Sequence, residues 1–142
     1  MCATQADLPG FPHAVRLHVH WGEMDALGHV NNICLFRWFE TSRIDAMSAM
    51  GVVFDPSSRI GPILAETACT YHTPIRAPVE VIVGTRVGRV GRTSVRLEHG
   101  VALATDPSHL VAEGYAVAVW LDYTSGQPTP VPEAFRSATG AR

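Results

Sequence analysis

The residue types best suited to chemistry in this chain are gathered between positions 23 and 32, in the run Glu23-Met-Asp-Ala-Leu-Gly-His-Val-Asn-Asn32. Asp25 offers a carboxylate that can act as a general base or as a nucleophile. Further along, Asn31 or Asn32 is suited to cap a helix whose first backbone N–H groups have no partner within the helix. Those donors lie at the positive end of the helix dipole and can stabilise an oxyanion. The run therefore predicts a site for hydrolysis of an activated carbonyl.

The same run also has a purely structural interpretation. Asp and Asn side chains commonly bind their own backbone in turns, and Gly28 permits the left-handed backbone that a tight turn requires. On this interpretation Asp25 caps its own loop, and His29 orders the loop by hydrogen bonding. On the functional interpretation Asp25 reacts and His29 touches a substrate. The residues by themselves leave both interpretations open.

One long helix is expected to follow this run, from about residue 31 to about residue 50, with Gly51 as its C-terminal cap. When the helix is projected at roughly 100° per residue, its apolar side chains cover roughly two-thirds of the circumference. A surface helix buries a narrower stripe, so we expect this helix to be largely enclosed. The apolar positions are Ile33, Leu35, Phe36, Trp38, Phe39, Ile44, Ala46, Met47, Ala49 and Met50.

Two charged residues, Glu40 and Arg43, interrupt the apolar arc of this helix. Their spacing of three residues places them on neighbouring turns, where they can form an ion pair that holds the helix in place. Glu40 as a catalytic acid is the alternative. It is disfavoured because an adjacent arginine keeps a carboxylate ionised.

The rest of the chain favours antiparallel strands. Residues 14–21 alternate between apolar and polar side chains, which is the period of a half-buried strand. Further strands are expected over residues 63–71, 79–90, 94–104 and 110–123, with turns at 88–91 and 105–109. This order predicts an α+β fold in which one long central helix is wrapped by a curved antiparallel sheet of about five strands. A second copy of the chain could cover the sheet's edge strands.

Length and composition fit one globular domain. The chain has 142 residues, of which 46% are hydrophobic and 17% charged. We expect this domain to span residues 13–132, between a loose arm at 1–12 that is rich in Pro and Gly and a tail at 133–142 with a short helix near 133–137. The net charge of -2 disfavours nucleic acid as a partner. No apolar run approaches the roughly 20 residues of a membrane helix, and no signal peptide is visible.

The cysteines and histidines do not form a recognised metal motif. Cys2, Cys34 and Cys69 are widely spaced, with no CxxC pair, so neither a disulfide framework nor a zinc ribbon is indicated. Free, structural thiols in a reducing cytoplasm are the simplest interpretation. His18 and His20 share a strand face, but no third ligand stands at a recognised spacing, so no metal is predicted. The absence of a G-x-S-x-G segment argues against a serine nucleophile of the α/β-hydrolase type.

Beyond these patterns, the run from Asp25 to Asn32, followed by Phe39-Glu-Thr-Ser-Arg43, resembles the signature of the hotdog-fold thioesterases. More narrowly, it is similar to the branch that contains 4-hydroxybenzoyl-CoA thioesterase and the bacterial YbgC-like acyl-CoA thioesterases. The similarity covers about residues 14 to 132. It continues through Tyr71-His-Thr-Pro74, Val87-Gly-Arg-Val-Gly-Arg-Thr-Ser94, Leu110-Val-Ala-Glu-Gly114 and Trp120-Leu-Asp122.

The resemblance implies a role for particular residues. Asp25 occupies the position of the catalytic aspartate. Asn32 occupies the position whose backbone N–H polarises the thioester carbonyl, where related proteins often carry Tyr or His. The segment Gly91-Arg-Thr-Ser94, which includes Arg92 and Thr93, falls where the family often contacts coenzyme A, and Arg92 with Arg89 would meet its phosphates. The alternative is that both are solvated arginines of a turn. After Pro74 the family commonly has Gly-Asp, whereas this chain has Arg76-Ala-Pro-Val79, so a coenzyme contact there is not expected to carry over.

The implied reaction is hydrolysis of an acyl-CoA to a free acid and coenzyme A, without a cofactor, because coenzyme A is part of the substrate. The implied assembly is a homodimer or homotetramer with the site at a subunit interface. A hotdog hydratase is disfavoured because the spacing from Asp25 to His29 is one residue shorter than its usual Asp–His pair. An acyl-carrier-protein thioesterase and a non-catalytic acyl-CoA-binding module remain alternatives.

Overall fold

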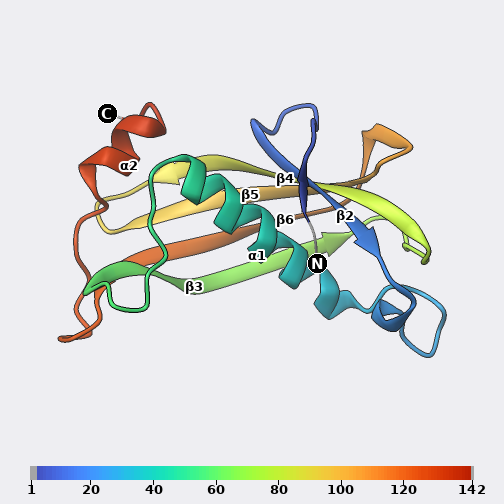
Figure 1. Ribbon diagram of the computed structural model, residues 1–142, viewed down its shortest axis with the longest axis horizontal. Coiled ribbons are helices and arrows are strands. Elements are labelled where there is room, and N and C mark those ends of the chain that lie inside the picture. The colour runs from blue at the N-terminus through green and yellow to red at the C-terminus, as the bar shows by residue number, and fades with distance from the viewer. Residues whose placement is uncertain (1–2, 142) are drawn as a thin grey trace.

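One antiparallel sheet carries one long helix on its face (Figure 1). The computed structural model describes residues 3–141. The strands are β1 (Thr4–Gln5), β2 (His13–Val19), β3 (Ile60–Tyr71), β4 (Val79–Val90), β5 (Ser94–Leu103) and β6 (Asp106–Asp122). The helices are the 3-10 turn η1 (Trp21–Glu23), α1 (Asn32–Ala49) and α2 (Glu133–Ala138). The strand order is β1-β2-β4-β5-β6-β3, and every pairing is antiparallel. The predicted α+β fold is therefore confirmed, with six strands rather than about five.

Helix α1 begins and ends where the sequence places its caps. The Asn31 side chain accepts the Ile33 N–H at 3.1 Å, and Gly51 follows the helix with a φ of +88°. Trp38 and Phe39 are fully buried against the inner face of the sheet. Their neighbours in this core are Val15, Leu17, Val19, Val81, Val83 and Val101. Burial of these large side chains fixes the helix on the sheet.

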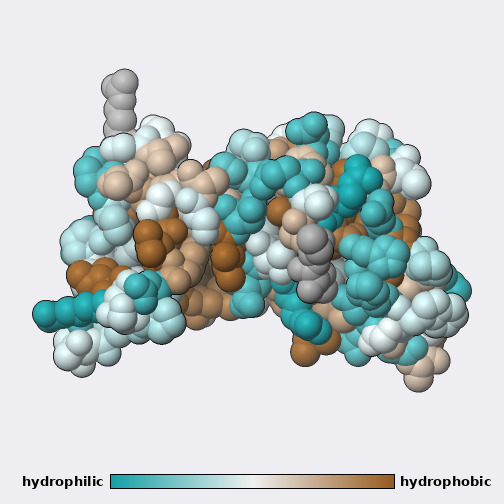
Figure 2. All heavy atoms as spheres, viewed as in Figure 1, coloured by the Kyte–Doolittle hydropathy of each residue, from teal (hydrophilic) through white to brown (hydrophobic). Residues whose placement is uncertain are grey.

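The expected enclosure of α1 is wrong for the single chain. Ile33 is 61% exposed and Ile44 is 42% exposed, and both belong to the predicted apolar arc. On the neighbouring edge strand β3, Ile63 and Leu64 are 40% and 48% exposed. Figure 2 shows apolar side chains reaching the surface on the face of the molecule that carries α1. One chain covers the sheet side of the helix and leaves the side toward β3 open.

The predicted strands are present, with shifted ends. β3 begins three residues earlier than expected, at Ile60, and β6 begins at Asp106 rather than near Leu110. The turn expected over 105–109 is confined to residues 104 and 105. The pairing then moves from Leu103–Asp106 to Ala102–Leu110, which leaves residues 107–109 as a bulge. A bulge accommodates Pro107, which cannot donate to a strand ladder.

The segments that flank the expected domain are part of the fold. The expected loose arm differs from the structure over residues 3–12, because β1 pairs with β2 and because Leu8 and Phe11 are buried against the outer face of the sheet. Met1 and Cys2 lie outside the described residues. At the other end, Phe135 of α2 is buried and packs on Trp120, with ring centroids 5.1 Å apart.

A buried polar chain links α1 to the sheet. Ser42 Oγ donates to the Val83 carbonyl at 2.9 Å and therefore accepts from Thr85 Oγ1 at 2.7 Å. Since the Thr85 proton is then used, His99 Nδ1, 3.0 Å from Thr85 Oγ1, is the donor of the last bond. The His99 ring stacks on Phe39 with centroids 4.7 Å apart. Burial, with the nearby Arg43 charge, lowers the pKa of His99 to about 3, so the imidazole is neutral.

The predicted pair of Glu40 and Arg43 is present as a loose contact. Arg43 Nη2 lies 3.9 Å from Glu40 Oε2, and the Arg43 side chain is 10% exposed while that of Glu40 is 64% exposed. Burial lowers the pKa of Arg43, and the Glu40 charge opposes that effect. The arginine is thus the buried partner, and Glu40 faces the solvent. An exposed carboxylate held beside a guanidinium is a poor general acid.

Candidate active site

The loop from Asp25 to His29 is closed by its own backbone. The Asp25 N–H donates to the His29 carbonyl at 2.8 Å, and the Gly28 N–H donates to the Asp25 carbonyl at 3.1 Å. Gly28 has a φ of +77°, which favours glycine. Asp25 Oδ1 accepts the N–H groups of Leu27 at 2.8 Å and of His29 at 3.4 Å. The structural interpretation of the run is therefore correct for Oδ1, whereas Oδ2 has no hydrogen-bond partner among residues 3–141.

Asn32 is the first residue of α1, and its backbone N–H is left free. The Asn31 side chain takes the Ile33 N–H, and the Asn31 carbonyl takes the Cys34 N–H at 2.9 Å. No acceptor for the Asn32 N–H is found in the part of the chain that the structure describes. Asn31 therefore satisfies the N–H groups of Ile33 and Cys34, and the N–H of Asn32 stays available for a ligand.

Three hydrogen bonds join the helix entrance to the chain that leaves β3. The Val30 N–H donates to the Ile75 carbonyl at 2.8 Å, and the Tyr71 hydroxyl donates to the Asn32 carbonyl at 2.9 Å. Arg76 Nη2 lies 3.0 Å from His29 Nε2. Because a guanidinium only donates, Nε2 is the acceptor, and in this contact the ring proton of His29 is on Nδ1.

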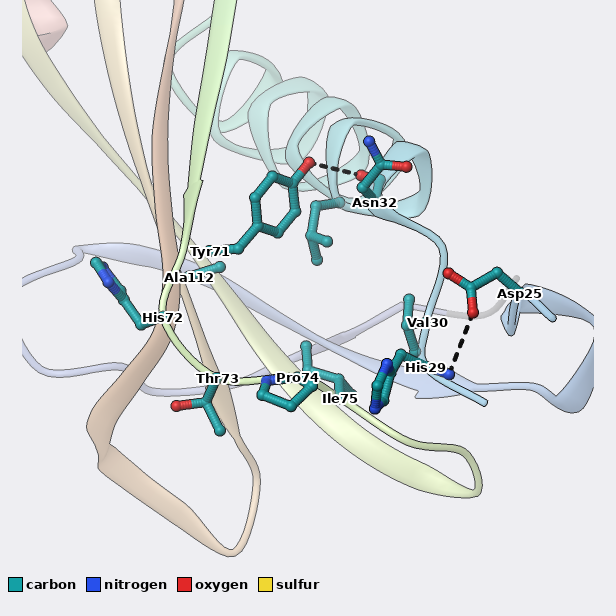
Figure 3. Close-up of a pocket in the computed structure, with 11 residues that line it drawn as sticks. Asp25, His29, Val30, Asn32, Tyr71, His72, Thr73, Pro74, Ile75 and Ala112 are labelled. Atoms are coloured by element: carbon teal, nitrogen blue, oxygen red, sulfur yellow. Dashed lines mark hydrogen bonds between the residues drawn. The ribbon is translucent and has the colours of Figure 1, made fainter. Parts of the chain in front are cut away.

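A cavity of about 350 Å³ lies between these two segments. Figure 3 shows Asp25 and Asn32 on the side of the helix entrance, and Tyr71 to Ile75 on the opposite side. The lining residues are Asp25, His29, Val30, Asn32, Leu35, Tyr71, His72, Thr73, Pro74, Ile75 and Ala112. The structure thus brings together the three residues predicted to carry the chemistry: Asp25, His29 and Asn32.

Glu23, the other carboxylate of the run, has a structural role. Its two oxygens accept the Trp38 Nε1–H at 3.1 Å and the His20 N–H at 2.8 Å. It therefore ties η1 to the buried face of α1. Neither described cysteine is a candidate nucleophile, because burial raises the pKa of the thiols of Cys34 and Cys69.

The residues expected to contact coenzyme A lie far from this cavity in the same chain. They form the β4–β5 hairpin, whose flanking residues Val90 and Val95 pack with Met47 and Met50 at the C-terminal end of α1. Asn32 is at the opposite end of this 18-residue helix, which is about 27 Å long. Arg89 and Arg92 are exposed, whereas Gly91, Thr93 and Ser94 are half-buried.

The hairpin also anchors the C-terminal segment. The Arg136 guanidinium donates to the Gly91 carbonyl at 2.7 Å, and the Val131 N–H donates to the Arg92 carbonyl at 2.8 Å. The Thr93 carbonyl accepts the Trp120 N–H at 2.8 Å. All three contacts use backbone carbonyls of the hairpin, so the side chains of Arg89 and Arg92 remain exposed to solvent.

Sequence patterns assign no role to the wall formed by Tyr71 to Ile75, or to Arg76. Tyr71-His-Thr-Pro74 is part of the resemblance, but nothing in its spacing indicates that it faces Asp25. Within residues 3–141, no group of three His, Cys, Asp or Glu side chains is placed to hold a metal ion. None of the helices there combines the length and apolar composition needed to cross a membrane.

Comparison with known proteins identifies the family. The sequence model of the thioesterase-like superfamily matches residues 19–139. The chain belongs to this superfamily. A proposed thioesterase from Pseudomonas aeruginosa is 33% identical, with 90% of this chain and 98% of that chain covered and a TM-score of 0.84. A Thermus thermophilus thioesterase solved with coenzyme A and Zn is 34% identical, covering 93% and 100% of the two chains, with a TM-score of 0.77.

A plant protein also resembles this member of the thioesterase-like superfamily. It is the chloroplastic acyl-acyl carrier protein thioesterase of Arabidopsis thaliana, which is 28% identical over 130 residues, or 90% of this chain and 68% of that protein. Together these likenesses confirm the predicted hotdog fold and support the predicted thioester hydrolysis. The narrower assignment to the 4-hydroxybenzoyl-CoA and YbgC-like branch stays a prediction.

Proposed function

We propose that the protein hydrolyses acyl-CoA thioesters to a free acid and coenzyme A. The observation that carries this proposal is that the free Oδ2 of Asp25 and the unpaired N–H of Asn32 belong to residues that line one cavity. The likeness to a thioesterase solved with coenzyme A supports the choice of substrate. Four further cavities among the described residues do not combine a carboxylate with the start of a long helix.

In the proposed reaction the thioester oxygen accepts the Asn32 N–H, which stabilises the charge that develops on that oxygen. On one route, Asp25 takes a proton from water, the hydroxide adds to the carbonyl carbon, and the C–S bond breaks as the thiolate leaves and takes up that proton. On the other, the carboxylate attacks the carbonyl carbon, the C–S bond breaks to expel the thiolate, and a mixed anhydride forms. Water then hydrolyses the anhydride to the free acid and the Asp25 carboxylate, and the proton released is taken up by the thiolate. The two N–H bonds to Oδ1 orient the carboxylate for either route.

His29 supports this chemistry in two ways. Its backbone closes the loop with Asp25 in both directions, through bonds of 2.8 Å and 3.4 Å. Its contact with Arg76 keeps the proton on Nδ1, so the ring offers a donor on the side away from Arg76. We propose that His29 orders the loop and that its Nδ1–H is available to a bound substrate.

An acyl-carrier-protein thioester is the second candidate substrate, favoured by the likeness to the Arabidopsis thaliana enzyme. The two substrates share the thioester and the pantetheine arm and differ in what carries that arm. A thiol-release assay separates them, with matched acyl groups presented on coenzyme A and on acyl carrier protein. We expect the higher kcat/KM with acyl-CoA. Tight binding of acyl-CoA with no release of thiol would instead support the non-catalytic binding module.

We propose that the working unit is a dimer, or a tetramer of such dimers, in which two copies pair along β3. This strand ends the sheet and exposes Ile60, Ile63 and Leu64. Antiparallel pairing about a two-fold axis reverses the second copy. Its β4–β5 hairpin then lies at the end of the sheet where the first copy has Asp25, which explains how Arg89 and Arg92 can serve a site that is distant in their own chain.

Mixed dimers test this arrangement. Asp25→Asn and the double variant Arg89→Ala/Arg92→Ala are each expected to be impaired alone. After co-refolding at equal concentration, half of the dimers are mixed and each mixed dimer has one intact site, so about a quarter of the wild-type activity should return. The measurement is thiol release at a subsaturating acyl-CoA concentration. Activity equal to the average of the two variants refolded separately would contradict the shared site.

A further inference from the structure

One side chain, that of Tyr71, forms a hydrogen bond between the end of β3 and the first residue of α1. The bond from the Tyr71 hydroxyl to the Asn32 carbonyl, 2.9 Å long, is the one hydrogen bond between α1 and β3 within residues 3–141. The Tyr71 ring is also part of the wall of the Asp25 cavity, and the residue is 46% exposed. Figure 3 shows the ring reaching from the end of β3 toward the first turn of the helix.

Apolar surface continues along the same boundary beyond Tyr71. Phe36 of α1 and Cys69 of β3 are half-buried, and Ile33 is exposed. Farther along lies a second cavity of about 170 Å³. Its walls are formed by Glu40, Arg43, Ile44, Met47, Phe54, Pro62, Ile63, Leu64 and Ala118. Asn32 and Arg43 are separated by about 16 Å along the helix axis.

The two cavities therefore border the same helix and the same strand, and Tyr71 stands where the first cavity ends and the open boundary begins. A chain bound by its thioester beside Asp25 has apolar surface to follow in this direction, toward Leu35 and then the open faces of α1 and β3. The ring of Tyr71 is in its way. In a dimer paired along β3, the second copy would cover the outer side of this path.

We propose that Tyr71 is a specificity-determining residue that limits the length of the acyl chain. This inference rests on the proposed function, because it concerns the acyl group of that substrate. The hydroxyl anchors the ring across the boundary, and the ring confines the acyl group to the cavity of about 350 Å³. Burial, with a contribution from Cys69, raises the pKa of Tyr71 to about 12, so the anchoring proton is retained throughout the neutral range.

Removal of the ring should favour longer substrates. In the wild type, methylene groups beyond those that fill the cavity have no apolar surface to cover and add little to binding. In Tyr71→Ala they can cover the surface of Phe36 and Ile33, and each buried methylene should raise kcat/KM by about fourfold. Tyr71→Phe keeps the ring without its anchor, so we expect a smaller change in the same direction.

The experiment measures kcat/KM for straight-chain acyl-CoAs from hexanoyl to hexadecanoyl. We expect Tyr71→Ala to raise the ratio of dodecanoyl to hexanoyl activity by at least about tenfold over wild type. Tyr123→Ala is the matched control. Tyr123 is 48% exposed, and its hydroxyl donates to the Pro62 carbonyl at 3.1 Å, away from the Asp25 cavity. Its ratio should equal that of the wild type.

The outcomes separate this inference from the proposed function. An active Tyr71→Ala with a wild-type length profile would overturn the barrier and leave acyl-CoA hydrolysis standing. A wild-type profile in Tyr71→Phe would overturn the anchoring of the ring by its hydroxyl. An equal change of the dodecanoyl to hexanoyl ratio in Tyr123→Ala would also overturn the barrier. The change would then come from a loss of order in β3 rather than from removal of the Tyr71 ring. Absence of hydrolysis by the wild type at every chain length would overturn the proposed function and the barrier together.

Discussion

Replacement of Asp25 by asparagine should lower kcat for thioester hydrolysis by about three orders of magnitude while leaving KM within a few-fold of wild type. The amide can neither take a proton from water nor form a mixed anhydride. Its Oδ1 can still accept the N–H groups of Leu27 and His29, which Asp25 Oδ1 binds at 2.8 Å and 3.4 Å. The loop and the cavity should therefore persist. Steady-state thiol release measures kcat and KM, and circular dichroism checks that the fold is preserved.

Asp55 provides the matched control for that substitution. Its Oδ1 also caps a turn, accepting the Ser57 N–H at 2.8 Å, but it is remote from the cavity. Asp55→Asn should keep wild-type activity. Asp25→Ala removes the loop cap as well as the carboxylate, so a further loss relative to Asp25→Asn measures the structural part of the role. Retention of more than about a tenth of the activity in Asp25→Asn would reject Asp25 as base or nucleophile.

Periodicity predicted the large elements of the fold because each of them repeats a pattern over many residues. The strand over 79–90 and the helix after Asn31 have ends within one residue of the prediction. A short segment with only one or two buried side chains shows no period, and for that reason the sequence does not predict the packing of Leu8, Phe11 and Phe135. Pro9 and Gly10 favour a loose arm, whereas in the structure they form a turn between the buried residues Leu8 and Phe11.

The helix projection shows a different limit. The pattern along α1 correctly identifies apolar positions, yet it does not say which molecule covers them. Ile33 and Ile44 lie on the open side toward β3, so the enclosure expected for the helix is incomplete in one chain. This is the pattern expected if a second copy covers that side, as the proposed dimer requires.

The candidate site was predictable only where it is local in sequence. Asp25, His29 and Asn32 fall within eight residues, and helix capping places them at one point. The opposite wall begins at Tyr71. Only the pairing of β3 with β6, the bond from the Val30 N–H to the Ile75 carbonyl and the bond from the Tyr71 hydroxyl to the Asn32 carbonyl bring it there. No local pattern encodes such a contact. No local pattern predicts the place of the β4–β5 hairpin either. The hairpin is far from Asp25 because β4 runs from the Asp25 end of the sheet to the opposite end.

Asn32→Pro tests the other half of the proposed chemistry, because it deletes the backbone N–H that is expected to hold the thioester oxygen. Proline is tolerated at the first position of a helix, where the N–H has no helical partner. The preceding residue must be extended, and Asn31 already has φ of -59° and ψ of 133°. The Asn32 carbonyl, which binds Tyr71, is retained. The variant should fold with a Tm close to wild type.

Loss of one oxyanion donor should lower kcat by about 100- to 1,000-fold. Asn32→Ala is the control that decides the meaning of this result, since it removes the same side chain and keeps the N–H; its kcat should stay within a few-fold of wild type. If both variants lose activity equally, the amide side chain rather than the backbone acts on the substrate. If neither does, the oxygen is held elsewhere, and the free N–H of Asn32 is only the ordinary unpaired donor of a helix terminus. Suppose that Asn32→Pro loses activity, that Asn32→Ala does not, and that Asp25→Asn does. The Asn32 N–H would then hold the thioester oxygen, and Asp25, seven residues earlier in the sequence, would act at the carbonyl carbon as base or nucleophile.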